Sequence, residues 1–91
     1  MNLERAQGAK ARTEQRMKLF RYYFDSYNER EALNLKMREE ILKRAHKSLA
    51  LVKQAKTKFS LGEYLVAKHI FDRASDELGR AIDYMHESGG A

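Results

Sequence analysis

The most regular pattern of apolar and polar positions lies near the carboxyl end of the chain. There, large apolar residues alternate with alanine at steps of three and four, at Tyr64, Ala67, Phe71, Ala74, Leu78, Ala81 and Met85. Such steps place side chains on one face of an α-helix, and an alanine at every seventh position lets a neighbouring helix come close. The pattern predicts a helix over about residues 63–86 with these residues as its core seam, followed by a frayed tail at residues 87–91.

A longer apolar stripe precedes this seam. It runs through Leu33, Met37, Ile41, Ala45, Leu49, Val52, Ala55 and Phe59, without glycine or proline. It predicts a helix over about residues 28–59, which starts at one of two overlapping cap signals in the stretch "DSYNERE". Unbroken, this helix would be about 45 Å long, whereas a compact domain of this size has a radius of gyration of about 12 Å. Either the helix is interrupted near "HKSLA", or the molecule is elongated.

The stretch "SLGEY" separates these two stripes. Gly62 can take the left-handed backbone conformation that ends a helix, and Ser60 with Glu63 has the spacing of a cap for the next helix. We therefore expect the second and third helices to form a hairpin across this turn.

The stretch "FRYYFDSY", residues 20–27, contains five aromatic residues, in a chain with five tyrosines and four phenylalanines. At 100° per residue four of these rings fall within about 100° of one another, and Tyr22 points away. Rings at such spacings usually meet other helices, whereas base-stacking platforms usually lie on sheets or loops. The stretch predicts a helix over about residues 4–25, with an aromatic packing or docking strip made of Phe20, Tyr23, Phe24 and Tyr27.

The aromatic strip and the alanines of the seam both need an apolar neighbour. If the first helix folds onto the other two, the strip and the seam cover each other, and a partner binds a shallow outer groove near Leu65 or Leu51. If the first helix swings away, a homodimer or a larger assembly must cover the strip. The predicted fold class is all-α, with residues 1–91 as a single domain: a three-helix bundle, or an elongated helical hairpin with an additional amino-terminal helix.

Composition narrows the classes of protein. The chain has no cysteine, which excludes disulfides, thiolate zinc sites and cysteine nucleophiles. No run approaches the roughly 20 apolar residues of a membrane helix, and the amino end "MNLERAQGAK" lacks the apolar core of a secretory signal. We therefore expect a soluble, cytoplasmic protein.

The charge is uneven along the chain, whose formal net charge is +5. Between Glu40 and Glu63 every charged residue is basic, and four of these cations fall on one side of the second helix. They are a candidate contact for a polyanion such as RNA or DNA: Lys43, Arg44, Lys47 and Lys58. A solvated helix face is the favoured interpretation of this set.

The sequence offers little material for catalysis. His69 with Asp72 and Asp76, and Asp83 with His86, have spacings that could hold a metal on a helix, but both groups lie away from the seam. Bundle metal sites project their ligands inward from several helices, so we interpret these residues as surface groups. No glycine-rich phosphate loop, nucleophile elbow or paired catalytic carboxylates occur. We expect no enzyme activity, no metal and no cofactor.

Residues 48–85, "SLALVKQAKTKFSLGEYLVAKHIFDRASDELGRAIDYM", resemble a tetratricopeptide-type helical hairpin and, more closely, the first two helices of a MIT (microtubule-interacting and trafficking) domain. The matching residues are Leu51, Val52, Ala55, Gly62, Tyr64, Ala67, Phe71, Ala74, Ala81, Ile82 and Tyr84. The resemblance implies a protein that binds helical or extended partner segments in grooves between helices. A MIT domain has its third helix after this hairpin, whereas here the additional helix comes before it.

Together these patterns predict a non-enzymatic protein–protein interaction or assembly subunit that docks partner helices through its hairpin. Its partners would be proteins, with a homodimer or a larger assembly as one form. The alternative is a small basic RNA- or DNA-associated protein within a larger ribonucleoprotein or nucleoprotein complex.

Overall fold

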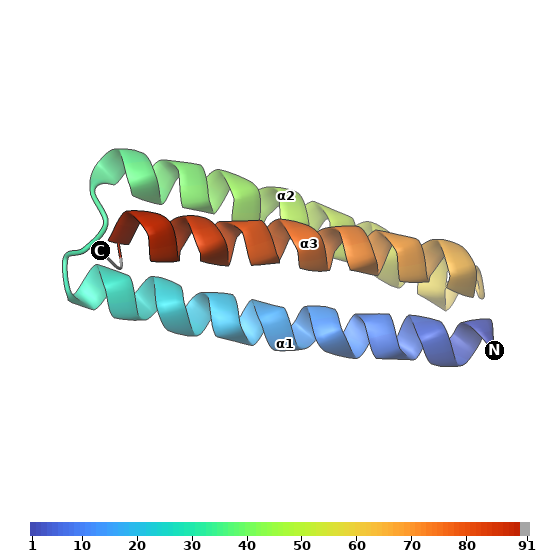
Figure 1. Cartoon of the computed structure of the whole chain (residues 1–91). Helices are drawn as coiled ribbons and strands as arrows, with labels where there is room; N and C mark the ends of the chain where they lie inside the picture. Colours follow the sequence, from blue (N-terminus) through green and yellow to red (C-terminus); the bar gives the residue numbers. More distant parts are fainter. Residues whose placement is uncertain (90–91) are drawn as a thin grey trace.

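The computed structural model describes residues 1–89, which form three α-helices: α1 (Asn2–Glu29), α2 (Leu35–Ser60) and α3 (Tyr64–Gly89). The predicted all-α class is confirmed. The helices lie side by side; α1 and α3 run in the same direction and α2 runs opposite to them (Figure 1). The molecule extends over 44 × 17 × 16 Å, with a radius of gyration of 14.3 Å. Because α2 is unbroken, the elongated form is the one that the chain adopts.

The first turn lies later in the chain than the sequence predicted. Helix α1 continues to Glu29, and the N-cap of α2 is Asn34, whose Oδ1 accepts a hydrogen bond from the Met37 amide at 2.9 Å. The two predicted cap signals therefore lie within or just after α1. The physical reason is the buried ring of Tyr27, which contributes to the core only while α1 stays helical around it.

Helix α1 ends without a glycine. Glu31 takes the left-handed conformation, with φ 53°, and its amide donates to the carbonyl of Asn28 at 3.0 Å. The Ala32 amide donates to the carbonyl of Tyr27 at 2.9 Å. This is the hydrogen-bond pattern of a Schellman motif, which usually places glycine at the left-handed position.

The second turn uses the same motif with the expected residue. Gly62 has φ 79°, its amide donates to the Phe59 carbonyl at 3.0 Å, and the Glu63 amide donates to the Lys58 carbonyl at 3.0 Å. Ser60 is the last residue of α2 rather than a cap for α3. The hairpin of α2 and α3 thus forms at the predicted glycine.

The core consists of two clusters, one toward each end of the bundle. The first, here called the alanine cluster, lies near the α2–α3 turn and contains the buried residues Ala9, Leu51, Val52, Ala55, Ala67, Phe71 and Ala74. The second, here called the aromatic cluster, lies toward residues 30–34; it contains Tyr27, Leu33, Ile41, Ile82 and Met85, with Phe20, Tyr23, Phe24 and Tyr84 among the residues packed against it. The structure buries every residue of the predicted α3 seam except Tyr64, which is half-buried.

Small residues bring α1 and α3 together along the first half of α1. Ala6, Ala9 and Thr13 are buried there, although the sequence drew attention only to the aromatic strip further along. The Thr13 hydroxyl lies 2.8 Å from the Ala9 carbonyl oxygen and 2.9 Å from that of Phe71 on α3. A side chain of α1 therefore reaches the backbone of α3, which requires a close approach of the two helices.

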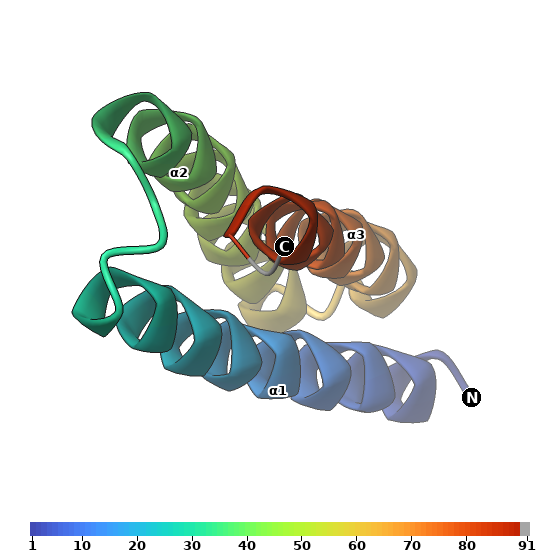
Figure 2. The ribbon, with the colours of Figure 1, turned by 60° about the vertical axis from the view of Figure 1, so that its left-hand side comes forward.

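The three helices do not pack equally in pairs. Helix α3 packs against both α1 and α2, whereas α1 and α2 make few contacts with each other. They approach near the α2–α3 turn, where the Lys10 ammonium lies 5.5 Å from the centre of the Phe59 ring, and they separate toward residues 30–34 (Figure 2). Helix α3 is therefore the common neighbour of the other two helices.

Candidate docking groove

A groove of about 680 Å³ lies between α1 and α2. We call it the α1–α2 groove. It is lined by Glu14, Met17, Lys18, Phe20, Arg21, Phe24 and Asp25 from α1, by Ala45, Leu49 and Lys56 from α2, and by Leu78 from α3. Its apolar lining therefore comes from all three helices, and charged residues accompany it on α1 and α2.

The aromatic residues of α1 serve the core and the groove at the same time. Phe20 and Phe24 lie one turn apart, with ring centres 5.7 Å apart and planes inclined by 11°. Both are half-buried, pack against the aromatic cluster and line the groove. Of the predicted aromatic strip, only Tyr27 is fully buried. Because α2 turns away at this end, it does not cover the two phenylalanines.

On α2 the groove continues into a row of exposed leucines. Leu35, Leu42 and Leu49 follow at intervals of seven residues and are 66%, 40% and 44% exposed. Seven residues are close to two helical turns, so the three side chains lie along one side of α2 over about 21 Å. We call them the leucine row. The interval of seven is readable in the sequence, but the apolar stripe predicted for this helix placed Leu49 in the core.

Two leucines of α2 have the opposite exposure to the predicted one: Leu49, expected in the core, is exposed, and Leu51, expected near an outer groove, is buried in the alanine cluster. Leu65, on α3, is exposed as expected. The reason is Ser48, a polar residue at the centre of the buried side of α2, whose hydroxyl donates to the Arg44 carbonyl at 3.1 Å. A pattern of apolar residues alone passes over Ser48 and takes the neighbouring Leu49 in its place.

The cations that accompany the groove are not engaged by carboxylates. Within residues 1–89, Lys18, Arg21 and Lys56 take part in no ion pair. Two acidic residues, Glu14 and Asp25, lie on the α1 side, whereas the α2 side of the lining has Lys56 and no acid. The groove is thus most positive along α2.

The candidate polyanion contact lies elsewhere, and most of it is paired. Lys47 and Lys58 contact Glu77 and Glu63 at 3.5 and 3.4 Å. Arg44 lies 3.3 Å from Glu40 and also stacks over the Tyr84 ring, 5.7 Å from its centre. The fourth residue of the set, Lys43, is exposed beside a small hollow that Lys36, Glu39, Glu40 and Tyr84 also line. The paired cations link α2 to α3, to the turn before α3 or to α2 itself, so nucleic-acid binding stays a prediction that this arrangement does not favour.

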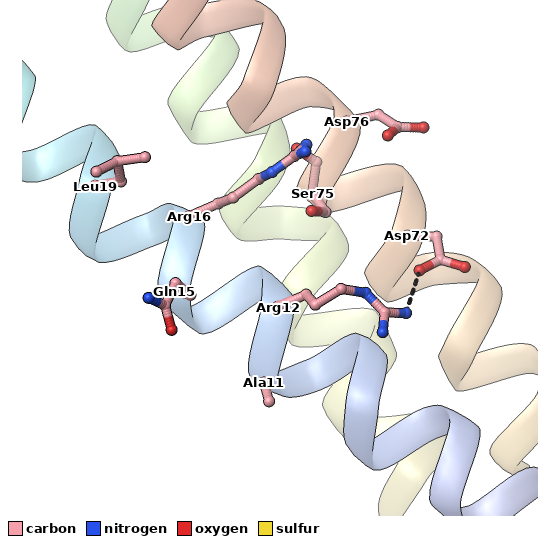
Figure 3. Close-up of a pocket in the computed structure, with 8 residues that line it drawn as sticks. All are labelled: Ala11, Arg12, Gln15, Arg16, Leu19, Asp72, Ser75 and Asp76. Carbon is pink, nitrogen blue, oxygen red and sulfur yellow. Dashed lines mark hydrogen bonds and ion pairs between the residues drawn. The ribbon is translucent and has the colours of Figure 1, made fainter.

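A second, more polar hollow of about 750 Å³ lies between α1 and α3 (Figure 3). Arg16 crosses it and donates from Nη1 to the Ser75 carbonyl at 2.8 Å. A Cβ atom on Gly79 would lie 2.8 Å from the same nitrogen, so the glycine makes room for the arginine. Arg12 reaches Asp72 at 3.6 Å, and Asp76 points away from both arginines. The arginines here bind α3 itself.

The histidine and carboxylate groups do not assemble a metal site in the described part of the chain. Asp72 is held by Lys68 at 2.8 Å and by Arg12, and His69 is exposed. His86 is exposed as predicted, but it is not simply solvated: its Nδ1 lies 2.7 Å from the Tyr27 hydroxyl, and its ring meets the Tyr23 ring edge-on at 4.5 Å. It links α3 to α1 at the aromatic end.

Comparison of the chain with protein-family models, with curated proteins and with solved structures found no match. The resemblance of residues 48–85 to MIT and tetratricopeptide hairpins is therefore not demonstrated. None of the helices within residues 1–89 combines the length and the apolar character needed to cross a bilayer.

Proposed function

We propose that this chain is a non-enzymatic interaction or assembly subunit that binds an α-helix of a partner protein in the α1–α2 groove. The observation that carries the proposal is the unequal packing of the bundle. Helices α1 and α2 both pack on α3, but between them they leave Leu49 exposed and Met17 and Phe24 only half-buried. A helix placed there would contact α1 and α2 and complete a four-helix arrangement.

The dimensions of the groove suit a short helix. Its α1 side extends from Glu14 to Asp25, a length of about 17 Å or three helical turns. A helix with apolar residues at intervals of three and four presents one apolar face, which is the kind of surface that an apolar groove between helices binds. We place this role in the cytoplasm, in keeping with a chain that has no cysteine.

The resemblance to MIT and tetratricopeptide hairpins supports the same class of function, since it implies docking between helices. It does not supply the groove proposed here. That groove uses α1, which precedes the resembling segment, as one of its two sides.

Selection of helical peptides from a displayed library on the full chain tests this proposal. The chain offers a matched pair of positions, since Leu49 in the groove is 44% exposed and Leu65 on α3 is 45% exposed. Leu49→Gln should weaken the selected peptides about tenfold, because it removes about 1–2 kcal/mol of apolar contact. Leu65→Gln should leave their affinity within about twofold. Peptides whose affinity is unchanged by Leu49→Gln, or is lowered equally by both variants, would contradict docking in the groove.

A further inference from the structure

We infer that the helix held in the α1–α2 groove is acidic and belongs to a protein other than this chain. The inference rests on the proposed function and specifies the partner. Its basis is the distribution of charge beside the groove and the leucine row, together with the faces that a second copy of the chain could offer.

The α2 side of the groove has basic residues and no acidic ones. At 100° per residue, Arg38, His46, Lys53 and Lys56 all fall within about 40° of the centre of the leucine row. All four are exposed. Glu39 lies further round the helix, about 60° from that centre, and no acidic residue occurs between Glu40 and Glu63. A helix that covers the leucines therefore places its flanking residues beside the cations Arg38, Lys53 and Lys56.

The α1 side of the groove does not cancel the positive charge of the α2 side. Lys18 and Arg21 are offset there by Glu14 and Asp25, so the four charges balance. The net field of the groove is thus that of α2, and it is positive. Oppositely charged flanking residues on the partner would accelerate association and fix its register.

A second copy of this chain is a poor occupant. Its own leucine row is flanked by the same cations, so contact between two rows would place like charges opposite each other. On α3, its exposed acidic residues are Asp76, Asp83 and Glu87. The large exposed apolar residues of α3 within residues 1–89 are Leu65 and Val66, at the opposite end of that helix. On α1, the exposed Leu19 and Tyr22 have two acidic residues nearby, Asp25 and Glu29. The adjacent cations Lys18 and Arg21 balance them, so this face does not offer the acidic, apolar surface that the groove requires.

Three synthetic peptides of about 18 residues, or five turns, provide the probe. They share one pattern of leucines at intervals of three and four, and their flanking positions are all glutamate, all glutamine or all lysine. Fluorescence anisotropy on the full chain measures their affinities at moderate salt. The glutamate peptide should bind about tenfold tighter than the glutamine peptide, and the lysine peptide should bind most weakly.

Charge reversal separates a specific site from general attraction. Arg38→Glu, Lys53→Glu and Lys56→Glu together should invert the order, so that the lysine peptide binds best. The matched control is Lys36→Glu, Lys43→Glu and Arg73→Glu, which changes the net charge equally at exposed positions away from the groove. The control variant should still prefer the glutamate peptide, and its affinity for that peptide should fall by less than about threefold. Circular dichroism checks that both triple variants stay helical.

The outcomes distinguish the inference from the proposed function. Peptides that are weakened by Leu49→Gln but show no preference for glutamate would contradict the acidic partner while supporting docking in the groove. The same conclusion follows if the control variant and the groove variant lose equal affinity for the glutamate peptide. If the chain sediments as a dimer that Leu42→Glu dissociates, a second copy is the occupant and the inference is overturned. If no peptide binds the monomer, the proposed function fails with it.

Discussion

The alanine cluster and the aromatic cluster show how side-chain size decides whether three helices close on one another. Near the α2–α3 turn the core consists mainly of alanines around Phe71, and α1 comes close enough for Thr13 to reach the carbonyl of Phe71. Toward residues 30–34 the core consists of larger side chains with several aromatic rings packed against them, and α1 and α2 diverge there. The same three helices are therefore closed at one end and open at the other, and the groove lies where they open.

The largest effect should come from a charge placed in the closed end. Phe71 is 0% exposed, and removal of a buried phenylalanine costs about 3–5 kcal/mol before the cost of burying a carboxylate is added. Since a small domain is stable by only about 5–15 kcal/mol, Phe71→Asp should abolish the cooperative thermal transition followed by circular dichroism. Phe24→Asp, at the half-buried ring that lines the groove, should retain it. A Phe71→Asp variant that melts like the parent would show that the alanine cluster is not core.

Overfilling the closed end should have a smaller effect. Ala74 is 0% exposed in the alanine cluster, and extra methylenes in a well-packed core cost about 1–3 kcal/mol. Urea unfolding should show this loss for Ala74→Leu, whereas Ala50→Leu, at an exposed position of α2, should change stability by less than about 0.5 kcal/mol. Equal stability of the two variants would mean that the helices are not closely packed there.

Arg16 and Gly79 test the polar link between α1 and α3. A hydrogen bond such as that from Arg16 to Ser75 contributes about 0.5–1.5 kcal/mol, and glycine costs about 1 kcal/mol against alanine in a helix. Gly79→Ala adds a Cβ only 2.8 Å from the guanidinium, so its gain in propensity should be offset by displacement of the arginine. In an Arg16→Met background the full gain of about 1 kcal/mol should appear. A Gly79→Ala effect that is equal in both backgrounds would rule out this coupling.

The smallest effect concerns the two turns. Glu31 holds φ 53° where the equivalent residue of the other turn is Gly62, with φ 79°. The left-handed conformation costs a non-glycine residue about 1–2 kcal/mol, and glycine avoids this cost. Glycine also loses more conformational entropy on folding than other residues do, which offsets part of the gain. Glu31→Gly should therefore stabilise the chain by about 0.5–1 kcal/mol, and Gly62→Ala should destabilise it by a similar amount. Loss of stability in Glu31→Gly would indicate that the glutamate side chain contributes to this turn.

The sequence could predict the helices better than their ends. The α3 seam was readable because its strict steps of three and four admit one buried face, and Gly62 marked a turn because few residues adopt its backbone conformation. The start of α2 was misplaced because Ser26 and Asn28 have the chemistry of caps. The burial of Tyr27 keeps α1 helical through both, and a local cap is worth only about 1 kcal/mol against that burial.

That the chain is helical and that α3 has a continuous apolar face could be read from the sequence alone, because helical periodicity depends on local spacing. Which neighbour covers each face depends on how the three helices pack. Ala6, Ala9 and Thr13 carry no strong apolar signal, yet they are buried because a small residue is what a closely approaching helix needs. Leu49 is as apolar as Leu51, but α3 covers Leu51, whereas the divergence of α1 from α2 leaves Leu49 in an open groove. Burial depends on the distance between helices, and that distance is set by side chains far apart in the chain.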